Sequence, residues 1–223
     1  AHAAYSHALQ WVVTGKKEHA DKSMEIMNAW ASEFSGMRSS GYSLQKHLEA
    51  SWVAPTWCGA GEIIRHYKNG AAGWQQSEIE RFEGMMRKLY EISHWTYEGA
   101  KNNWAVAGCM AHLAIGSFLS DEKIFQEGLD MFERIIDYNI HEDGWVFHTC
   151  RDCMHVQFNI IGFLHAAEIA WHQGVDLYGF KRDGEEKPRI MKGMEFHATQ
   201  MLGEDTWGKC QISCSGYKRG GGG

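Results

Sequence analysis

Residues 103–119 read Asn103-Trp104-Ala105-Val106-Ala107-Gly108-Cys109-Met110, followed by Ala111-His112-Leu113-Ala114-Ile115-Gly116-Ser117-Phe118-Leu119. This long apolar stretch predicts a helix that begins where the loop 98–101 meets Asn102. A second polar segment, 151–158, places a guanidinium and an imidazole at another predicted helix start. Backbone N–H groups point outward at the start of a helix, so both segments suit the binding of a carboxylate, for which an acidic sugar is the obvious candidate.

Apolar residues recur at helical spacing along nearly all of the chain, and no segment shows the sustained alternation of a strand. The sequence therefore predicts an all-α fold. Ser77 and Glu80 form a predicted capping box, and Pro55 predicts a break before the next helix begins. Besides 103–119, helices are expected at Ala3–Thr14, Thr56–Lys68, Asp121–Asn139, His155–His172 and Ile190–Met201.

Glycine-containing turns separate the predicted helices, and short connections make successive helices antiparallel neighbours. Repeated helical hairpins favour an α/α toroid, incomplete or complete, or a solenoid, and no fixed repeat period of the tetratricopeptide kind is present. We expect a single domain over 1–223. Because the chain begins inside a predicted helix and ends in four glycines, we expect it to be truncated at one or both ends.

Charge and hydropathy limit the partners. The chain has 22 Lys and Arg against 28 Asp and Glu, a net charge of -6, which gives little support for nucleic-acid binding. No apolar run approaches the roughly 20 residues that cross a bilayer, so no membrane partner is expected. A polyanionic substrate would need a local positive lining, which Lys101, Arg151, Lys218 and Arg219 could supply.

The 6 cysteines permit disulfides without requiring them. Cys150-x-x-Cys153 with Cys210-x-x-x-Cys214 is also similar in spacing to a zinc site, although the second pair is one residue wider than usual. Disulfides, buried thiols and a structural metal are all left open at this point. The predicted site includes no metal and no cofactor.

Two neighbouring asparagines carry the first part of the predicted chemistry. An Asn at a helix N-cap satisfies a backbone N–H, which accounts for one of Asn102 and Asn103 but less well for both. The second amide, Asn103, can face a cleft and donate to a carboxylate while the Trp104 indole stacks on a sugar ring.

A second cluster follows in the chain. Arg151 and His155 lie four residues apart and share a face if the helix begins before Arg151. Gln157 adds an amide, and His148 lies just upstream. The alternative is a surface contact between Arg151 and Asp152 and a His155 satisfied in the core, but the clustering favours a functional interpretation.

Several short motifs, in their order, resemble the alginate lyase family of α/α-toroid polysaccharide lyases. They are Leu9–Gly15, Ala29–Ala31, Asn102–Trp104, Asp143–Gly144, Arg151, His155–Phe158, Ala166–Ala170 and Gly174–Tyr178. The resemblance covers most of the chain. It implies β-elimination of an acidic polysaccharide of the alginate or glucuronan type, by a protein that is secreted or extracellular (periplasmic if bacterial).

The resemblance also assigns roles to residues. By motif position, Asn103 would neutralise the substrate carboxylate with help from Arg151. The family's Asn-Asn-His is Asn-Asn-Trp here, so the base expected at position 104 is absent. His155 falls where a family aromatic acid or base, usually Tyr, is expected and is the leading candidate for proton transfer. Tyr217 is a second candidate, as an acid whose loop would fold over the cleft.

Aromatic residues complete the predicted substrate-binding set. Trp52 and Trp57 are predicted stacking platforms for sugars, whereas most other tryptophans are expected in the core or the cleft wall. The remaining members of the set are Lys101, Asn102, Trp104, His148 and Gln157. The other histidines, including His94 and His112, are interpreted as packing or surface residues.

Two other functions stay open. Inverting glycoside hydrolases also use helical toroids, with two carboxylates ~6.5–9.5 Å apart. The available carboxylates are Glu62, Asp143, Asp152 and Glu168, none of them in a paired motif. The nonenzymatic alternative is a helical-repeat binding scaffold. A zinc ion would cross-link it through Cys150, Cys153, Cys210 and Cys214.

Overall fold

The computed structural model describes residues 1–202, which form helices joined by loops and one isolated bridge between Ile140 and Val146. The helices are α1 (His2–Thr14), α2 (Lys17–Glu33), α3 (Gln45–His66), α4 (Gln76–Gly99), α5 (Asn103–Leu119), α6 (Glu122–Asn139), α7 (Cys153–His172) and α8 (Arg189–Met201). The predicted all-α class is confirmed, and α5 has the predicted bounds. In this part of the chain, no helix has the length and apolar character needed to cross a membrane.

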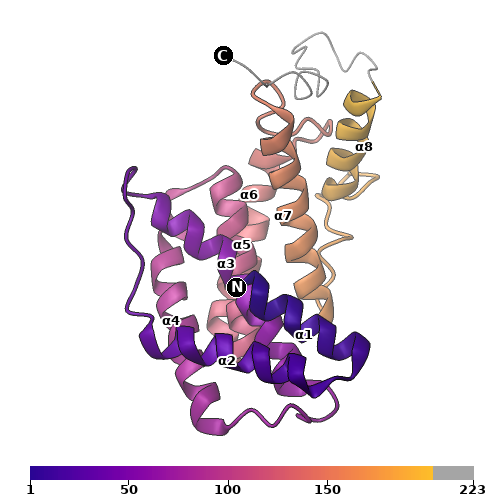
Figure 1. The fold of residues 1–223 in the computed structure, drawn as a ribbon. Coiled ribbons are helices and arrows are strands. Elements are labelled where there is room, and N and C mark those ends of the chain that lie inside the picture. Colours follow the sequence, from indigo (N-terminus) through magenta and orange to yellow (C-terminus); the bar gives the residue numbers. More distant parts are fainter. Residues whose placement is uncertain (203–223) are drawn as a thin grey trace, which may run out of the picture.

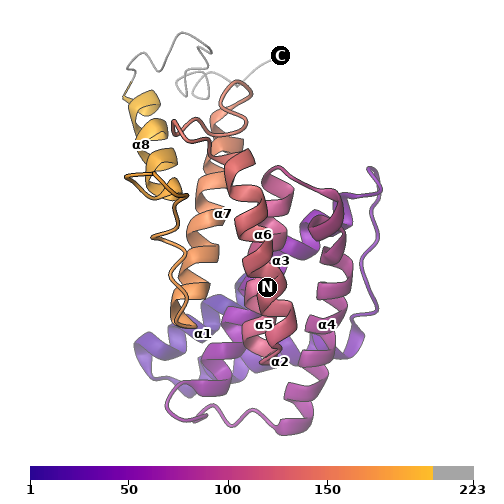
Figure 2. The same ribbon diagram turned by 180° about the vertical axis from the view of Figure 1, so that it is seen from behind.

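Helix α5 holds the packing together, because it contacts α3, α4, α6 and α7. Its residues Ile115 and Phe118 belong to a core shared with α1 to α4, whereas Val106 and Leu113 belong to a core shared with α6, α7 and α8. Burial on both faces explains why its sequence is apolar all round. The second core includes Ile190 of α8, and Figures 1 and 2 show α8 beside α7, at the end of the molecule away from α4.

The break predicted at Pro55 is wrong, because α3 runs through this residue without interruption. A proline inside a helix removes one backbone hydrogen bond and usually kinks or ends the helix. Here Ala54, Trp57 and Ile64 are buried in the core around it. Burial of both halves of α3 therefore outweighs the local penalty.

The capping box of α4 lies two residues before the predicted one. Helix α4 begins at Gln76, the Gln75 side chain accepts from the backbone of the first turn, and the Glu78 carboxylate accepts from the Gln75 N–H at 3.2 Å. Ser77 and Glu80 are thus inside the helix. Residues 75–80 contain two possible capping pairs, Gln75 with Glu78 and Ser77 with Glu80. The residue at which α4 begins decides between them.

Glycines allow α5 to approach its neighbours closely. A Cβ added to Gly108 would overlap the Thr96 side chain of α4, and one added to Gly116 would overlap the backbone of Phe125 in α6. Backbone cannot move aside as a flexible side chain does, so α5 and α6 pack at a distance that requires glycine at position 116.

We expect Gly116→Ala to lower the free energy of unfolding by about 1–3 kcal/mol, because the added methyl forces α5 and α6 apart. Urea unfolding followed by circular dichroism measures the change. Gly84→Ala is the matched control: Gly84 lies in α4 and a Cβ there meets nothing within 4 Å. The control should raise stability by about 0.5–1 kcal/mol, and equal losses in both variants would contradict this account.

Candidate active site

The first turn of α5 separates the roles of the two asparagines. Asn102 is the N-cap, and its Oδ1 accepts from the Trp104 backbone N–H at 3.1 Å. Asn103 is not used for capping. Its side chain is buried to 7 % exposure, and its Oδ1 lies 3.3 Å from His148 Nε2. The amide oxygen only accepts, so His148 donates and the amide N–H groups of Asn103 remain available to another acceptor.

The loop between α6 and α7 brings His148 to this point. After the bridge of Ile140 with Val146, His148 adopts a left-handed backbone conformation with φ 78. This conformation is unfavourable for a residue with a Cβ and is often found at functional sites. The His148 carbonyl accepts from the Arg151 N–H at 2.7 Å, which turns the chain toward α7. A strained residue at the centre of the cluster therefore supports a functional role.

The start of α7 carries a carboxylate–imidazole pair. Asp152 is the N-cap of α7, its Oδ1 accepting from the His155 backbone N–H at 2.7 Å. Both Asp152 oxygens also lie 2.7–2.8 Å from His155 Nδ1. Since a carboxylate only accepts, Nδ1 carries a proton, and Nε2 is the ring atom that can offer a lone pair. An imidazole oriented in this way can act as a general base.

The charges of the cluster are set by its surroundings. Partial burial alone would raise the pKa of Asp152, but hydrogen bonds from the backbone and ring of His155 and the charge of Arg151 lower it. Burial lowers the pKa of His148 to about 4, assisted by the nearby His155 and Arg151 and opposed by Asp152. His148 is therefore neutral near pH 7, and its ring centroid lies 5.2 Å from that of His155.

Aromatic rings lie near these polar groups. Phe158 lies beside His155, with ring centroids 5.8 Å apart, and Trp52 lies 6.0 Å beyond it. Trp104, next to Asn103 in the chain, has its ring centroid 6.0 Å from that of Tyr42. Trp52, Tyr42 and Phe158 are all exposed. Exposed aromatic faces next to hydrogen-bonding groups are typical of carbohydrate sites.

The family profile described as Alginate lyase matches residues 1–207 of this chain. The chain belongs to the alginate lyase family. No curated protein matches it at a significant level.

Solved structures share the fold of this alginate lyase family member. Alginate lyase A1-III from Sphingomonas species A1 aligns with a TM-score of 0.69 at 21% identity, over 88% of this chain and 56% of that one. Two variants of alginate lyase A1-III complexed with a tetrasaccharide align with TM-scores of 0.74 and 0.71 at 21% identity, over 92% of this chain and 63% and 60% of theirs. The helical toroid is thus confirmed, and the chain spans about 60% of the length of these structures.

Most residues predicted for the site of this alginate lyase family member lie close together. Asn103, His148 and His155 form one cluster, and Arg151 joins it through Asp152, with Nε to Oδ2 at 3.5 Å. Helix α7 begins at Cys153, so Arg151 precedes it and the predicted shared helix face with His155 does not exist. Lys101 and Gln157 are exposed on the same two segments.

One predicted residue within the described part of the chain does not join the site. Trp57 is 4 % exposed and packs against Trp30 and Phe82, so it belongs to the core and offers no open face for a sugar. It lies on the inward side of α3, five positions from exposed Trp52. Tyr217 lies outside the described residues.

The sequence did not indicate three residues that the structure adds to the site: Asp152 as the partner of His155, Phe158 and Tyr42. Asp152 had a usable signal, because an Asp three residues before a His at a helix start can both cap the helix and orient the ring. No sequence signal indicated Tyr42, because it precedes α3 and lies beside Trp104 only in the folded chain.

The cysteines next to the site are oxidised. Cys150 and Cys153 are disulfide-bonded. Their sulfurs are therefore not thiolates, and the proposed zinc site through the four spaced cysteines is not supported at its first pair. Cys210 and Cys214 lie outside the described residues.

We expect Asp152→Ala to lower the free energy of unfolding by about 0.5–2 kcal/mol at pH 7, because α7 loses its N-cap. The folded pKa of Asp152 lies below its ordinary value of 3.8. Its ionic contribution is therefore complete above about pH 4 and is lost as the pH falls through the lower, folded pKa. In urea unfolding, the difference from wild type should stay constant from pH 7 down to about pH 4 and shrink as the pH falls further.

Asp152→Asn is the matched control, since an amide oxygen can still cap the helix. It should retain most of the stability at pH 7. A loss as large as that of Asp152→Ala would show that capping is not what Asp152 contributes.

Proposed function

We propose that this chain is a polysaccharide lyase that cleaves a uronic-acid-containing polysaccharide, of the alginate or glucuronan type, by β-elimination. The observation that carries the proposal is the meeting of Asn103, His148 and the Asp152–His155 pair at the starts of two helices, in a chain of the alginate lyase family. Each group has a distinct task in such a reaction.

The carboxylate of the sugar is the first requirement. Removing the C5 proton leaves negative charge that spreads into the carboxylate, so this group must be neutralised by hydrogen bonds or positive charge. Asn103 donates its amide N–H groups, whose direction His148 fixes by holding the amide oxygen. Arg151, with a side chain that is 56% exposed, adds positive charge. One preorganised donor of this kind contributes about 2.7–4 kcal/mol to the transition state.

Proton transfer is the second requirement. His155 Nε2 takes the C5 proton, the C–H electron pair forms the C4–C5 double bond, and the bond from C4 to the glycosidic oxygen breaks. Asp152 stabilises the imidazolium that results. The leaving oxygen then receives a proton, either from the His155 imidazolium or from Tyr217. A Tyr217→Phe variant distinguishes the two donors, because activity survives that change only in the first case.

The bonding of the cysteines supports a cellular location for the protein. Disulfides persist in oxidising environments, and Cys150 and Cys153 are disulfide-bonded. We therefore propose that the protein is secreted or extracellular, or periplasmic in a bacterium, where an acidic polysaccharide would meet it.

Hydrolysis is the second candidate. A cavity of about 600 Å³ between α1, α3, α5 and α7 is lined by both Glu62 and Glu168. Burial raises the pKa of Glu62, whereas a hydrogen bond from Tyr178 lowers that of Glu168, the divergence expected of an acid and a base. However, the Glu168 oxygens already contact Tyr178 and His172. Elimination is therefore the better-supported reaction.

We expect the purified chain to release products with a new ultraviolet-absorbing double bond from at least one uronate polymer in a panel of acidic glycans. Saturated reducing ends without that absorbance would favour hydrolysis and should then disappear in Glu168→Gln. Neutral glucans serve as the negative substrate. A blank across the panel would overturn the proposed activity.

We expect Asn103→Ala to lower kcat about 10²–10³-fold and His155→Ala about 10²–10⁴-fold, with thermal unfolding little changed. Initial rates of double-bond formation measure both. His66→Gln is the control, because His66 is an exposed helical histidine outside the cluster and should keep full activity. Equal rates in all of these variants would remove Asn103 and His155 from the mechanism.

A further inference from the structure

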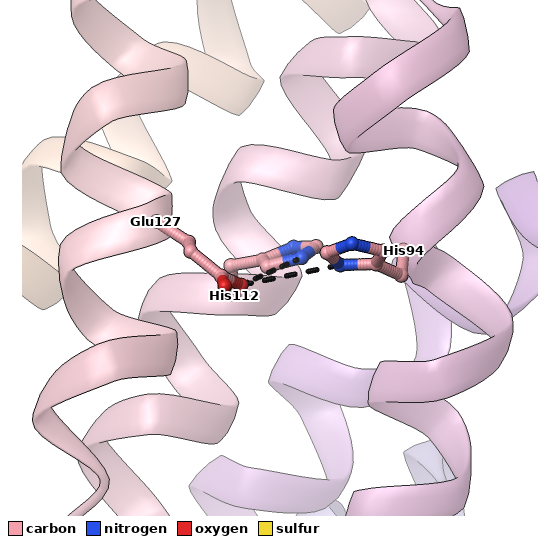
Figure 3. A group of neighbouring side chains, drawn as sticks. All are labelled: His94, His112 and Glu127. Carbon is pink, nitrogen blue, oxygen red and sulfur yellow. Dashed lines mark ion pairs between the residues drawn. The ribbon is translucent and has the colours of Figure 1, made fainter.

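Three consecutive helices bring together a second group of potential ligands. His94 comes from α4, His112 from α5 and Glu127 from α6, and Figure 3 shows their side chains pointing toward one another between these helices. Glu127 Oε2 lies 3.9 Å from His94 Nδ1 and 3.9 Å from His112 Nε2. One ligand atom from each residue lies within 4.8 Å of the others.

The proton on His112 can be placed from its contacts. Its Nδ1 lies 2.8 Å from the Gly108 carbonyl, which only accepts, so Nδ1 carries the hydrogen. The side chain is fully buried. Nε2 therefore points a lone pair toward Glu127 and has no hydrogen-bond partner.

His94 and Glu127 point into the same space between the three helices. His94 Nε2 is directed toward Glu98 at 3.7 Å, and its buried Nδ1 has no hydrogen-bond partner. The Tyr90 hydroxyl donates to Glu127 Oε2 at 2.8 Å and fixes the carboxylate. The lone pair that the Gly108 contact leaves on His112 Nε2 thus faces a carboxylate oxygen, an arrangement that is repulsive unless a positive charge lies between them.

We propose that His94, His112 and Glu127 bind a divalent transition-metal ion, Zn²⁺ by their donor set. Two imidazoles with one carboxylate are an established zinc ligand set. The backbone carbonyl behind His112 and the tyrosine hydroxyl on Glu127 are outer contacts of the kind that orient metal ligands. With bonds of about 2.0–2.1 Å, tetrahedral ligands lie roughly 3.4 Å apart, so the two pairs now 3.9 Å apart close by about 0.5 Å and the widest pair, within 4.8 Å, by at most about 1.4 Å.

The position of this site indicates a structural role. His112 lies nine residues after Asn103 on α5, about 13.5 Å along the helix axis, so the ion would not reach the substrate. It would instead join α4, α5 and α6. The exposed edge of His94, with a side chain that is 32% accessible, leaves a path for the ion and for a water as fourth ligand.

The experiment titrates Zn²⁺ into the full chain after treatment with a chelator, by isothermal calorimetry, and follows thermal unfolding with and without Zn²⁺. We expect Glu127→Gln and His94→Gln each to bind one Zn²⁺ fewer than wild type, or to bind it at least ~100-fold more weakly. Zn²⁺ should raise Tm in wild type and much less in these variants. Co²⁺ should give the intense visible absorption of a tetrahedral site in wild type only.

His66→Gln is the matched control, because His66 also lies four residues from a glutamate, at 3.6 Å, but on the surface. It should bind Zn²⁺ as wild type does. Glu127→Gln preserves shape and the Tyr90 contact, so circular dichroism should show it folded. Equal Zn²⁺ stoichiometry and affinity in wild type, Glu127→Gln and His94→Gln would overturn the proposal. So would loss of a site only in His66→Gln.

Discussion

Burial of α5 on both faces is the constraint on which the rest of the structure depends. A helix that is apolar all round must be covered on all sides, and α3, α4, α6 and α7 provide that cover. The two cores meet across it, and glycines at 108 and 116 let its neighbours approach closely. Because those contacts fix the position of α5, they also fix its first turn, where Asn103 lies.

The candidate active site depends on the fixed position of α5. Asn103 projects from the first turn of a fully packed helix, and His155 projects from the first turn of α7, which packs on α5. His148 comes from the loop between α6 and α7, and it is held by the bridge before it and by its hydrogen bond to Asn103. Groups placed on rigid elements keep the geometry that acid–base chemistry requires, and the loop supplies the residue that orients an amide.

The histidine–glutamate group lies among three of the same helices. Glu127, His94 and His112 link α4, α5 and α6 through buried polar atoms that would otherwise destabilise the core. A bound ion there would strengthen the contacts around α5 without taking part in the chemistry at its N-terminus. The candidate active site and the metal site would then be separate parts of one arrangement of packed helices.

The sequence by itself determined the helical class, the bounds of α5 and the candidate residues Asn103, Arg151 and His155, because helical periodicity and short motifs are local properties. It could not show that Pro55 lies inside a helix, or that Trp57 faces the core while Trp52 faces outward. Nor could it show that His94 and His112, 18 positions apart, share one carboxylate. These features depend on which faces of different helices meet, and only the tertiary packing decides that.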